Sequence, residues 1–136
     1  MTVAIPIPND RASFNVALAA IHADHIRLRA LAKAAIRSGF ATDDTLSLAA
    51  AATTHESNEA RLFDLPFVTR PPASVTASAA RARQHCLEFT SGSYHLPDAG
   101  IAAELFVDSL LAHLISEDAW LAREEEHQKE RLKTHD

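Results

Sequence analysis

Helix-breaking residues occur in only a few short stretches of this 136-residue chain, and long segments of helical periodicity lie between them. Three residues are Gly whereas 27 are Ala, a composition that favours helices over turn-rich sheets. The breaks lie at Pro6 to Asn9, Gly39, Pro66 to Pro72, and Gly92 to Pro97. They predict an all-α fold, an antiparallel up-down four-helix bundle.

The ends of these four helices carry recognisable residue types. The first helix is predicted to end at Gly39, after Arg37 in its last turn. The second is expected to begin at a cap in Thr42-Asp43-Asp44 and to reach about Leu62. The third is expected to run from a Ser74 cap to about Ser91, and the fourth from near Asp98 past Trp120.

Composition excludes several classes of protein. The net charge of -5 and the absence of a basic stripe argue against nucleic acid as a partner. The single Cys86 excludes an intramolecular disulfide and multi-cysteine metal sites. No signal peptide is recognisable, and no apolar run reaches the length of a membrane span. We therefore expect one cytoplasmic domain, 1–136, with a core over about 12–122 and a charged helical tail over 123–136.

Histidine is the one residue type in surplus, with 8 in the chain. Apolar residues spaced three and four apart mark the inward stripe of each predicted helix. Each stripe contains one histidine at its middle, and two stripes add a glutamate four residues later. These inward polar residues are His25, His55, Glu59, His85, His113 and Glu117.

Six polar groups inside so small a bundle need partners. An unpaired polar group costs on the order of 1–3 kcal/mol when buried, and an ionised carboxylate costs more. A domain of this size is stable by only roughly 5–15 kcal/mol in total. A metal site is the favoured explanation, and a buried polar network without metal is the alternative.

The residue types also narrow the choice of metal. Imidazole and carboxylate ligands without thiolate suit iron or manganese, with zinc or copper as further possibilities. Six ligands exceed the four that one tetrahedral ion takes, so a pair of ions bridged by carboxylates is the natural interpretation.

Three segments resemble the hemerythrin-like (HHE cation-binding) family of non-haem di-iron proteins. They are HADHIRLRAL on the first helix, HESNEARLFDLP on the second and HLISEDAWL on the fourth. The resemblance covers about residues 14 to 121. It departs on the third helix, where classical members carry two histidines four residues apart. Here Phe89 follows His85 at that spacing and Arg81 precedes it.

The resemblance implies a ligand set for two iron ions. His25 and His55 would hold one ion, and His85 and His113 would hold the other. Glu59 and Glu117 would bridge them, with Asp118 as the alternative to Glu117. Glu56 is expected to replace the absent histidine, and Glu88 and His22 are weaker alternatives for that role.

The implied function is the binding of iron together with O2, NO or peroxide, in sensing, ligand binding, redox chemistry or iron handling. An anionic Glu56 in place of a neutral histidine would favour ferric iron and disfavour stable O2 carriage. The alternatives are a di-iron oxidase or peroxidase acting on a small molecule, and an iron-dependent interaction module that uses the tail REEEHQKERLK. No membrane partner is expected, and a protein partner is not identified.

Overall fold

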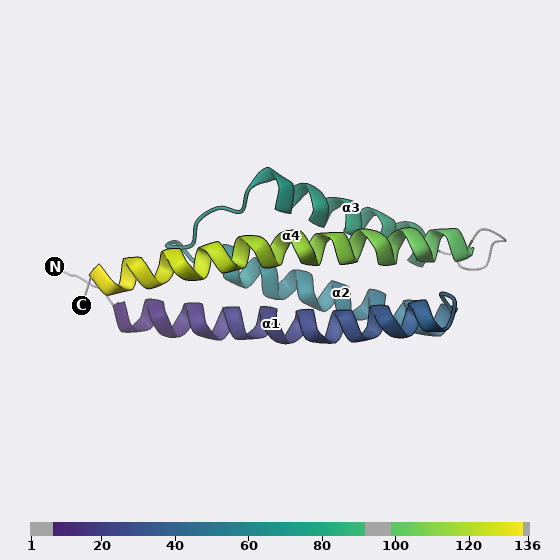
Figure 1. Ribbon diagram of the computed structural model, residues 1–136, viewed down its shortest axis with the longest axis horizontal. Helices are drawn as coiled ribbons and strands as arrows, with labels where there is room; N and C mark the ends of the chain where they lie inside the picture. Colours follow the sequence, from purple (N-terminus) through teal and green to yellow (C-terminus); the bar gives the residue numbers. More distant parts are fainter. Residues whose placement is uncertain (1–6, 92–98, 135–136) are drawn as a thin grey trace.

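Four helices form the protein in a computed structural model that describes residues 7–91 and 99–134 (Figure 1). The helices are α1 (Ile7–Arg37), α2 (Thr42–Phe63), α3 (Ala73–Thr90) and α4 (Ala99–Thr134). The described residues contain no strand, so the all-α prediction is confirmed. The expected fourth-helix start at Asp98 lies outside the described residues.

The end of α1 confirms the predicted role of Gly39. Its φ is 69°, a left-handed conformation that costs glycine little. The next residue, Phe40, also has a positive φ of 63°, and its N–H donates to the Ala35 carbonyl at 2.7 Å. This bond satisfies a carbonyl of the last helical turn, as glycine-terminated helices commonly do.

The predicted N-terminal caps of α2 and α3 are wrong. Ala41 and Pro72 occupy the cap positions, and neither makes a side-chain capping bond. Thr42 and Ser74 lie inside the helices, because the extended backbone ends before each of them. Asp43 and Asp44 do lie in the first turn of α2, where they complement the helix dipole as expected.

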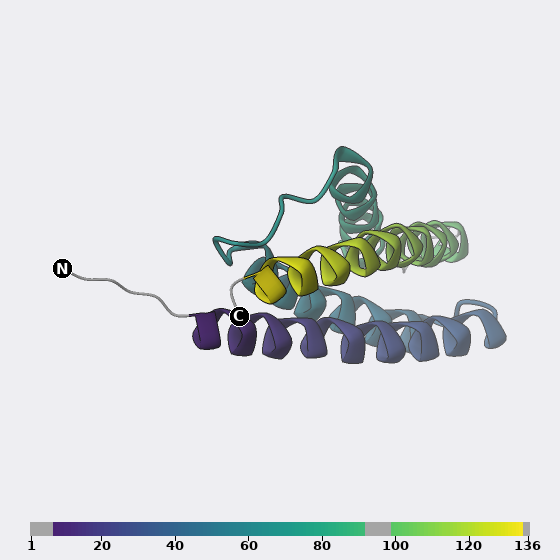
Figure 2. The same ribbon diagram turned by 60° about the vertical axis from the view of Figure 1, so that its left-hand side comes forward.

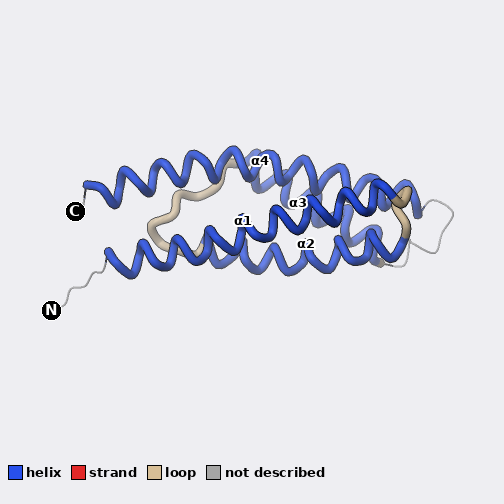
Figure 3. The backbone as a smooth tube through the Cα atoms, turned by 60° about the horizontal axis from the view of Figure 1, so that its bottom comes forward, coloured by secondary structure: helices blue, strands red, loops and turns tan. Residues whose placement is uncertain are grey.

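The helices lie side by side along the long axis of the molecule. Figures 1 and 2 show α3 alongside α4, and α1 alongside α2. The start of α1 and the end of α4 lie at the same end of the molecule (Figure 3). In Figure 2, α3 stands farther from α1 than α4 does. The buried apolar residues of the core come mainly from α1, α2 and α4.

Two apolar clusters form the core, and on α1, α2 and α4 the inward histidines lie between members of the two clusters. The first cluster includes Leu28 of α1, Leu48 of α2 and Phe106 of α4. The second includes Ile21 of α1, Leu62 of α2 and Trp120 of α4. On each of these helices the polar residues of the stripe fall between members of the two clusters, so apolar layers cover them on both sides along the bundle.

The last turns of α4 are more than a solvated tail. Glu124 and Gln128 are buried, and the Gln128 amide donates to Glu124 at 2.6 Å and to the Phe67 carbonyl at 3.1 Å. Glu124 also accepts a hydrogen bond from the Thr69 N–H at 3.0 Å. These bonds attach the segment between α2 and α3 to the end of α4.

Part of the apolar character of α4 follows from its place in the core, while Ile101, Leu105 and Ile115 are exposed. By length and composition alone, its segment Ala99–Arg131 passes as a possible membrane span, because an 18-residue window within it has a mean hydropathy of 1.5. Core helices of bundles share that composition. Phe106, Leu110 and Leu114 of this segment are buried against the other helices.

Candidate metal centre

A group of buried imidazoles and carboxylates lies between the two apolar clusters. The ligating atoms of its four members all lie within 4.8 Å of one another: His55, Glu59, His113 and Glu117. α2 supplies the first two and α4 the last two, each pair four residues apart on one helix face. His25 of α1 is also buried and contacts Glu117 directly.

Glu117 is the hub of the group. Its Oε1 accepts hydrogen bonds from Nε2 of His25 at 2.7 Å and from Nε2 of His55 at 3.0 Å. Its Oε2 lies 3.4 Å from His113 Nε2 and accepts no hydrogen bond from the described residues. Only 1% of the residue is exposed. A buried carboxylate oxygen left without a donor is an expensive feature, and a cation would satisfy it.

Glu59 is the second carboxylate of the group. Its Oε2 accepts a hydrogen bond from His113 Nε2 at 2.8 Å and lies 3.3 Å from His55 Nε2. The two glutamates therefore lie among three imidazoles that all present Nε2 inward. The protons on those nitrogens hold the carboxylate oxygens close to the imidazoles. A cation in place of those protons would bind both the imidazoles and the carboxylates.

The other ring nitrogen of each histidine has its own partner. Nδ1 of His25 lies 2.6 Å from Asp118, and Nδ1 of His55 lies 2.8 Å from Asp24. Nδ1 of His113 lies 2.8 Å from the hydroxyl of Ser78 on α3. Such outer hydrogen bonds fix the ring orientation and direct Nε2 inward, as in metal-ligating histidines generally.

All three of these partners are themselves held in place. Asn58 donates to the same Asp24 oxygen at 2.8 Å, and Arg29 donates to Asp118 at 2.5 Å. The Ser78 hydroxyl donates to the Val75 carbonyl at 3.0 Å, which leaves its oxygen to accept the Nδ1–H of the histidine. The outer groups are therefore oriented before any ligand arrives.

The carboxylates shift the pKa values of the group strongly. Burial alone lowers the pKa of His55, but hydrogen bonds to Glu117, Glu59 and Asp24 outweigh it and raise that pKa to about 10. For His113, burial is likewise outweighed by the two glutamates, and the pKa rises to about 9. Burial raises the pKa of Glu117, yet bonds from the histidines dominate and hold it well below its ordinary value.

The donor set fits a transition-metal ion. It combines neutral imidazole nitrogens and carboxylate oxygens, and it contains no thiolate, which suits iron, manganese or zinc. A buried His/Glu group that could hold a metal is therefore present, as predicted.

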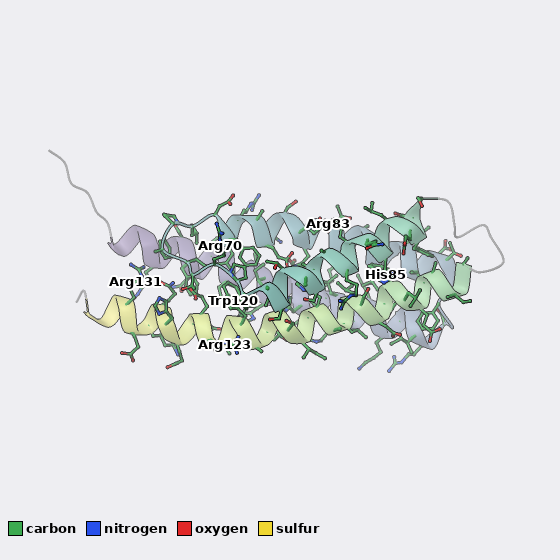
Figure 4. All side chains as sticks on the ribbon, turned by 90° about the horizontal axis from the view of Figure 1, so that it is seen from above. Arg70, Arg83, His85, Trp120, Arg123 and Arg131 are labelled. Atoms are coloured by element: carbon green, nitrogen blue, oxygen red, sulfur yellow. The ribbon has the colours of Figure 1, made fainter. Side chains whose placement is uncertain are left out.

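The structure places two of the predicted ligands elsewhere. His85 of α3 is partly exposed, and its Nδ1 contacts Glu88 at 3.0 Å. Glu56 accepts a hydrogen bond from Arg83 at 3.3 Å. Neither belongs to the buried group. Figure 4 shows Arg83 and His85 on α3, with Arg83 toward α2.

The remaining candidates have definite partners. Asp118 contacts His25 from outside the group. Burial raises the Asp118 pKa, but the hydrogen bonds with Arg29 and His25 outweigh burial and lower that pKa. His22 is exposed and contacts Glu125 at 3.2 Å. Asp118 therefore orients a histidine here, while Glu117 faces all three.

The sequence analysis did not predict that Asp24, Asn58 and Ser78 belong to the outer hydrogen bonds of the histidines. Ser78 lies on the predicted inward stripe of α3, which was the available indication of a role. Asp24 lies beside His25 in sequence but serves His55, a pairing that only the packing of α1 against α2 determines.

Two hollows that share part of their lining adjoin the group on the side of α3. A cavity of about 20 Å³ is lined by His55, Glu59 and His113 together with small and apolar side chains. A surface groove of about 300 Å³ reaches Glu59 and His113 from outside. Glu56 and Arg83 line both hollows.

Comparison with known proteins finds no significantly similar relative. No family model matches the chain, and neither a curated protein nor a solved structure is significantly similar to it.

Proposed function

We propose that this chain is a hemerythrin-like non-haem di-iron protein, an antiparallel up-down bundle that binds O2, NO or a related small molecule. The observation that carries the proposal is the position of Glu117. Its carboxylate contacts or approaches histidines of α1, α2 and α4, as a bridging ligand between two ions would.

We assign the ligands to two halves, with His55 between them because its Nε2 also lies 3.3 Å from Glu59 Oε2. His25 and His55 share Oε1 of Glu117, whereas His113 lies nearer Oε2 of Glu117 and Oε2 of Glu59. One ion would take the first pair of histidines, and the other would take His113. In this proposal the carboxylates of Glu59 and Glu117 would serve both ions.

The half around His113 has fewer protein donors. α3 contributes no histidine to the group, so this half offers one imidazole and two carboxylates. The cavity of about 20 Å³ adjoins it, with room for about one water-sized molecule. Ala52, Phe106 and Leu110 on its wall would limit access of bulk water. Iron bound here would supply redox chemistry toward O2, NO or peroxide.

One observation favours the second candidate, a di-iron oxidase or peroxidase acting on a small molecule. The groove of about 300 Å³ reaches Glu59 and His113 and has apolar walls at Ala60, Phe63 and Val75. Its size lies at the lower limit for small-molecule sites. Turnover of an organic reductant by the iron-loaded protein would support this candidate over a carrier or sensor.

A spectroscopic experiment tests the proposal. Protein loaded with Fe(II) without oxygen is exposed to O2 or to NO, and its visible spectrum is recorded. We expect new absorption bands in the wild type and in the exposed-site control His127→Ala, and their loss in His55→Ala. An iron-loaded wild type whose spectrum responds to neither gas would contradict the proposed function.

A further inference from the structure

We propose that small ligands reach the metal centre between α2 and α3, and that the Glu56–Arg83 ion pair closes this route. The inference rests on the proposed function, because it assigns an access route to the same site. It concerns uncharged ligands close to the size of a water molecule, such as NO, because the inner cavity has room for about one such molecule.

The two hollows define the route. Both are lined by Glu59 and His113 at their inner side, and both are lined by Glu56 of α2 and Arg83 of α3. The outer groove is open to solvent, and the inner cavity adjoins His55 as well. A molecule that passes from groove to cavity therefore moves between the two helices past this pair.

The ion pair joins the two helices across the route. Arg83 Nε donates to Glu56 Oε1 at 3.3 Å, and both side chains are about half exposed, at 55% and 42%. An exposed pair of this kind contributes little to stability and is screened by salt. It can therefore separate often, and when it is formed it links α2 and α3 at the part of the wall that the groove and the cavity share.

Ala79 marks the junction between the hollows. It is the one small apolar residue that lines both of them, and it is partly buried on α3. A larger side chain at this position would fill the space between groove and cavity. The adjacent Ala80 is exposed and lines neither hollow, which makes it a matched control for the same substitution.

The experiment measures how fast NO binds to the anaerobic Fe(II)-loaded protein in a stopped-flow spectrometer. NO is uncharged, so removing the charge of Arg83 does not change the electrostatic attraction between NO and the protein. Arg83→Met should raise both the association and dissociation rates, by up to about fivefold, and leave the affinity unchanged. The exposed control Arg81→Met should change neither rate.

Two further variants test the same route from the opposite direction. Ala79→Leu should slow association severalfold, while Ala80→Leu should bind NO at the wild-type rate. Exchanging the charges, Glu56→Arg with Arg83→Glu, should restore wild-type rates because it restores the pair. High salt should speed NO binding to the wild type but not to Arg83→Met.

The outcomes separate this proposal from the proposed function. If the wild type binds iron and NO, but Arg83→Met and Ala79→Leu both bind NO at the wild-type rate, the access route is overturned. Loss of iron from Glu56→Gln would also overturn it, because Glu56 would then be a ligand. If the wild type binds no iron or no NO, the proposed function itself fails.

Discussion

Oε1 of Glu117 on α4 lies 2.7 Å from Nε2 of His25 on α1, with both residues buried. The same oxygen lies 3.0 Å from Nε2 of His55 on α2. One carboxylate thus joins three helices at the centre of the bundle. The candidate metal site and the packing of the helices consequently depend on the same residue.

Replacing Glu117 should destabilise even the metal-free protein. Glu117→Ala leaves buried histidines without their acceptor, and breaking one side of such a pair costs about 3–5 kcal/mol. Glu125→Ala removes an exposed partner of His22 and should cost less than about 1 kcal/mol. Urea unfolding of both metal-free variants measures the difference. Equal stabilities would mean that Glu117 is not a structural hub.

The metal-free protein should lose stability as pH rises above neutral. The pKa values of His55 and His113 are raised to about 10 and 9 in the folded state, from 6.5 when unfolded. Their contribution to the free energy of unfolding is full below about pH 6.5, and it disappears as the pH rises through the folded-state pKa values. The lowered pKa of Glu117 adds stability that is lost on acidification below its ordinary 4.5. Denaturant midpoints at pH 6 and pH 9.5 test this, and a higher midpoint at pH 9.5 would contradict it.

Metal binding should have the opposite pH dependence. Metal ligation needs neutral imidazoles, so the ion must displace the protons that His55 and His113 carry at pH 7. Affinity for Zn²⁺ or Fe(II) should therefore increase between pH 6 and 9, with protons released on binding. Calorimetry in buffers of different ionisation enthalpy counts these protons. Binding without proton release would mean that the ion binds elsewhere.

Ser78 should act on metal affinity through His113. Ser78→Ala removes the acceptor for Nδ1–H of His113, and such outer partners typically change affinity about 10–100-fold. Ser109→Ala is the matched control, because each hydroxyl donates to a carbonyl three residues earlier in its helix. Competition with a chromophoric chelator gives the affinities. Equal losses in both variants would assign the effect to the helix and not to the histidine.

The central ligands were predictable because they follow helical periodicity. His25, His55, Glu59, His113 and Glu117 lie on stripes spaced three and four apart, and all five are buried. Burial of such residues depends only on which face of a helix turns inward. The sequence contains that information directly.

The rest depends on how the helices are placed relative to one another. His85 lies on the inward stripe of α3, yet it contacts Glu88 and not the buried group. Periodicity does not determine how far α3 stands from α2 or how it is shifted along α4. Glu124 and Gln128 continue the α4 stripe at the same spacing, but their charge and polarity indicated a solvated tail.

The most direct test is the iron content of wild-type protein and of single variants, after anaerobic Fe(II) loading and removal of unbound metal. We predict about two irons per chain in the wild type, as a carboxylate-bridged pair requires. His25→Ala and His113→Ala should lose iron, whereas His85→Ala and Glu56→Ala should retain it. A wild type that retains no iron, or one in which His85→Ala loses as much iron as His113→Ala, would contradict the assignment of the buried group as the metal centre.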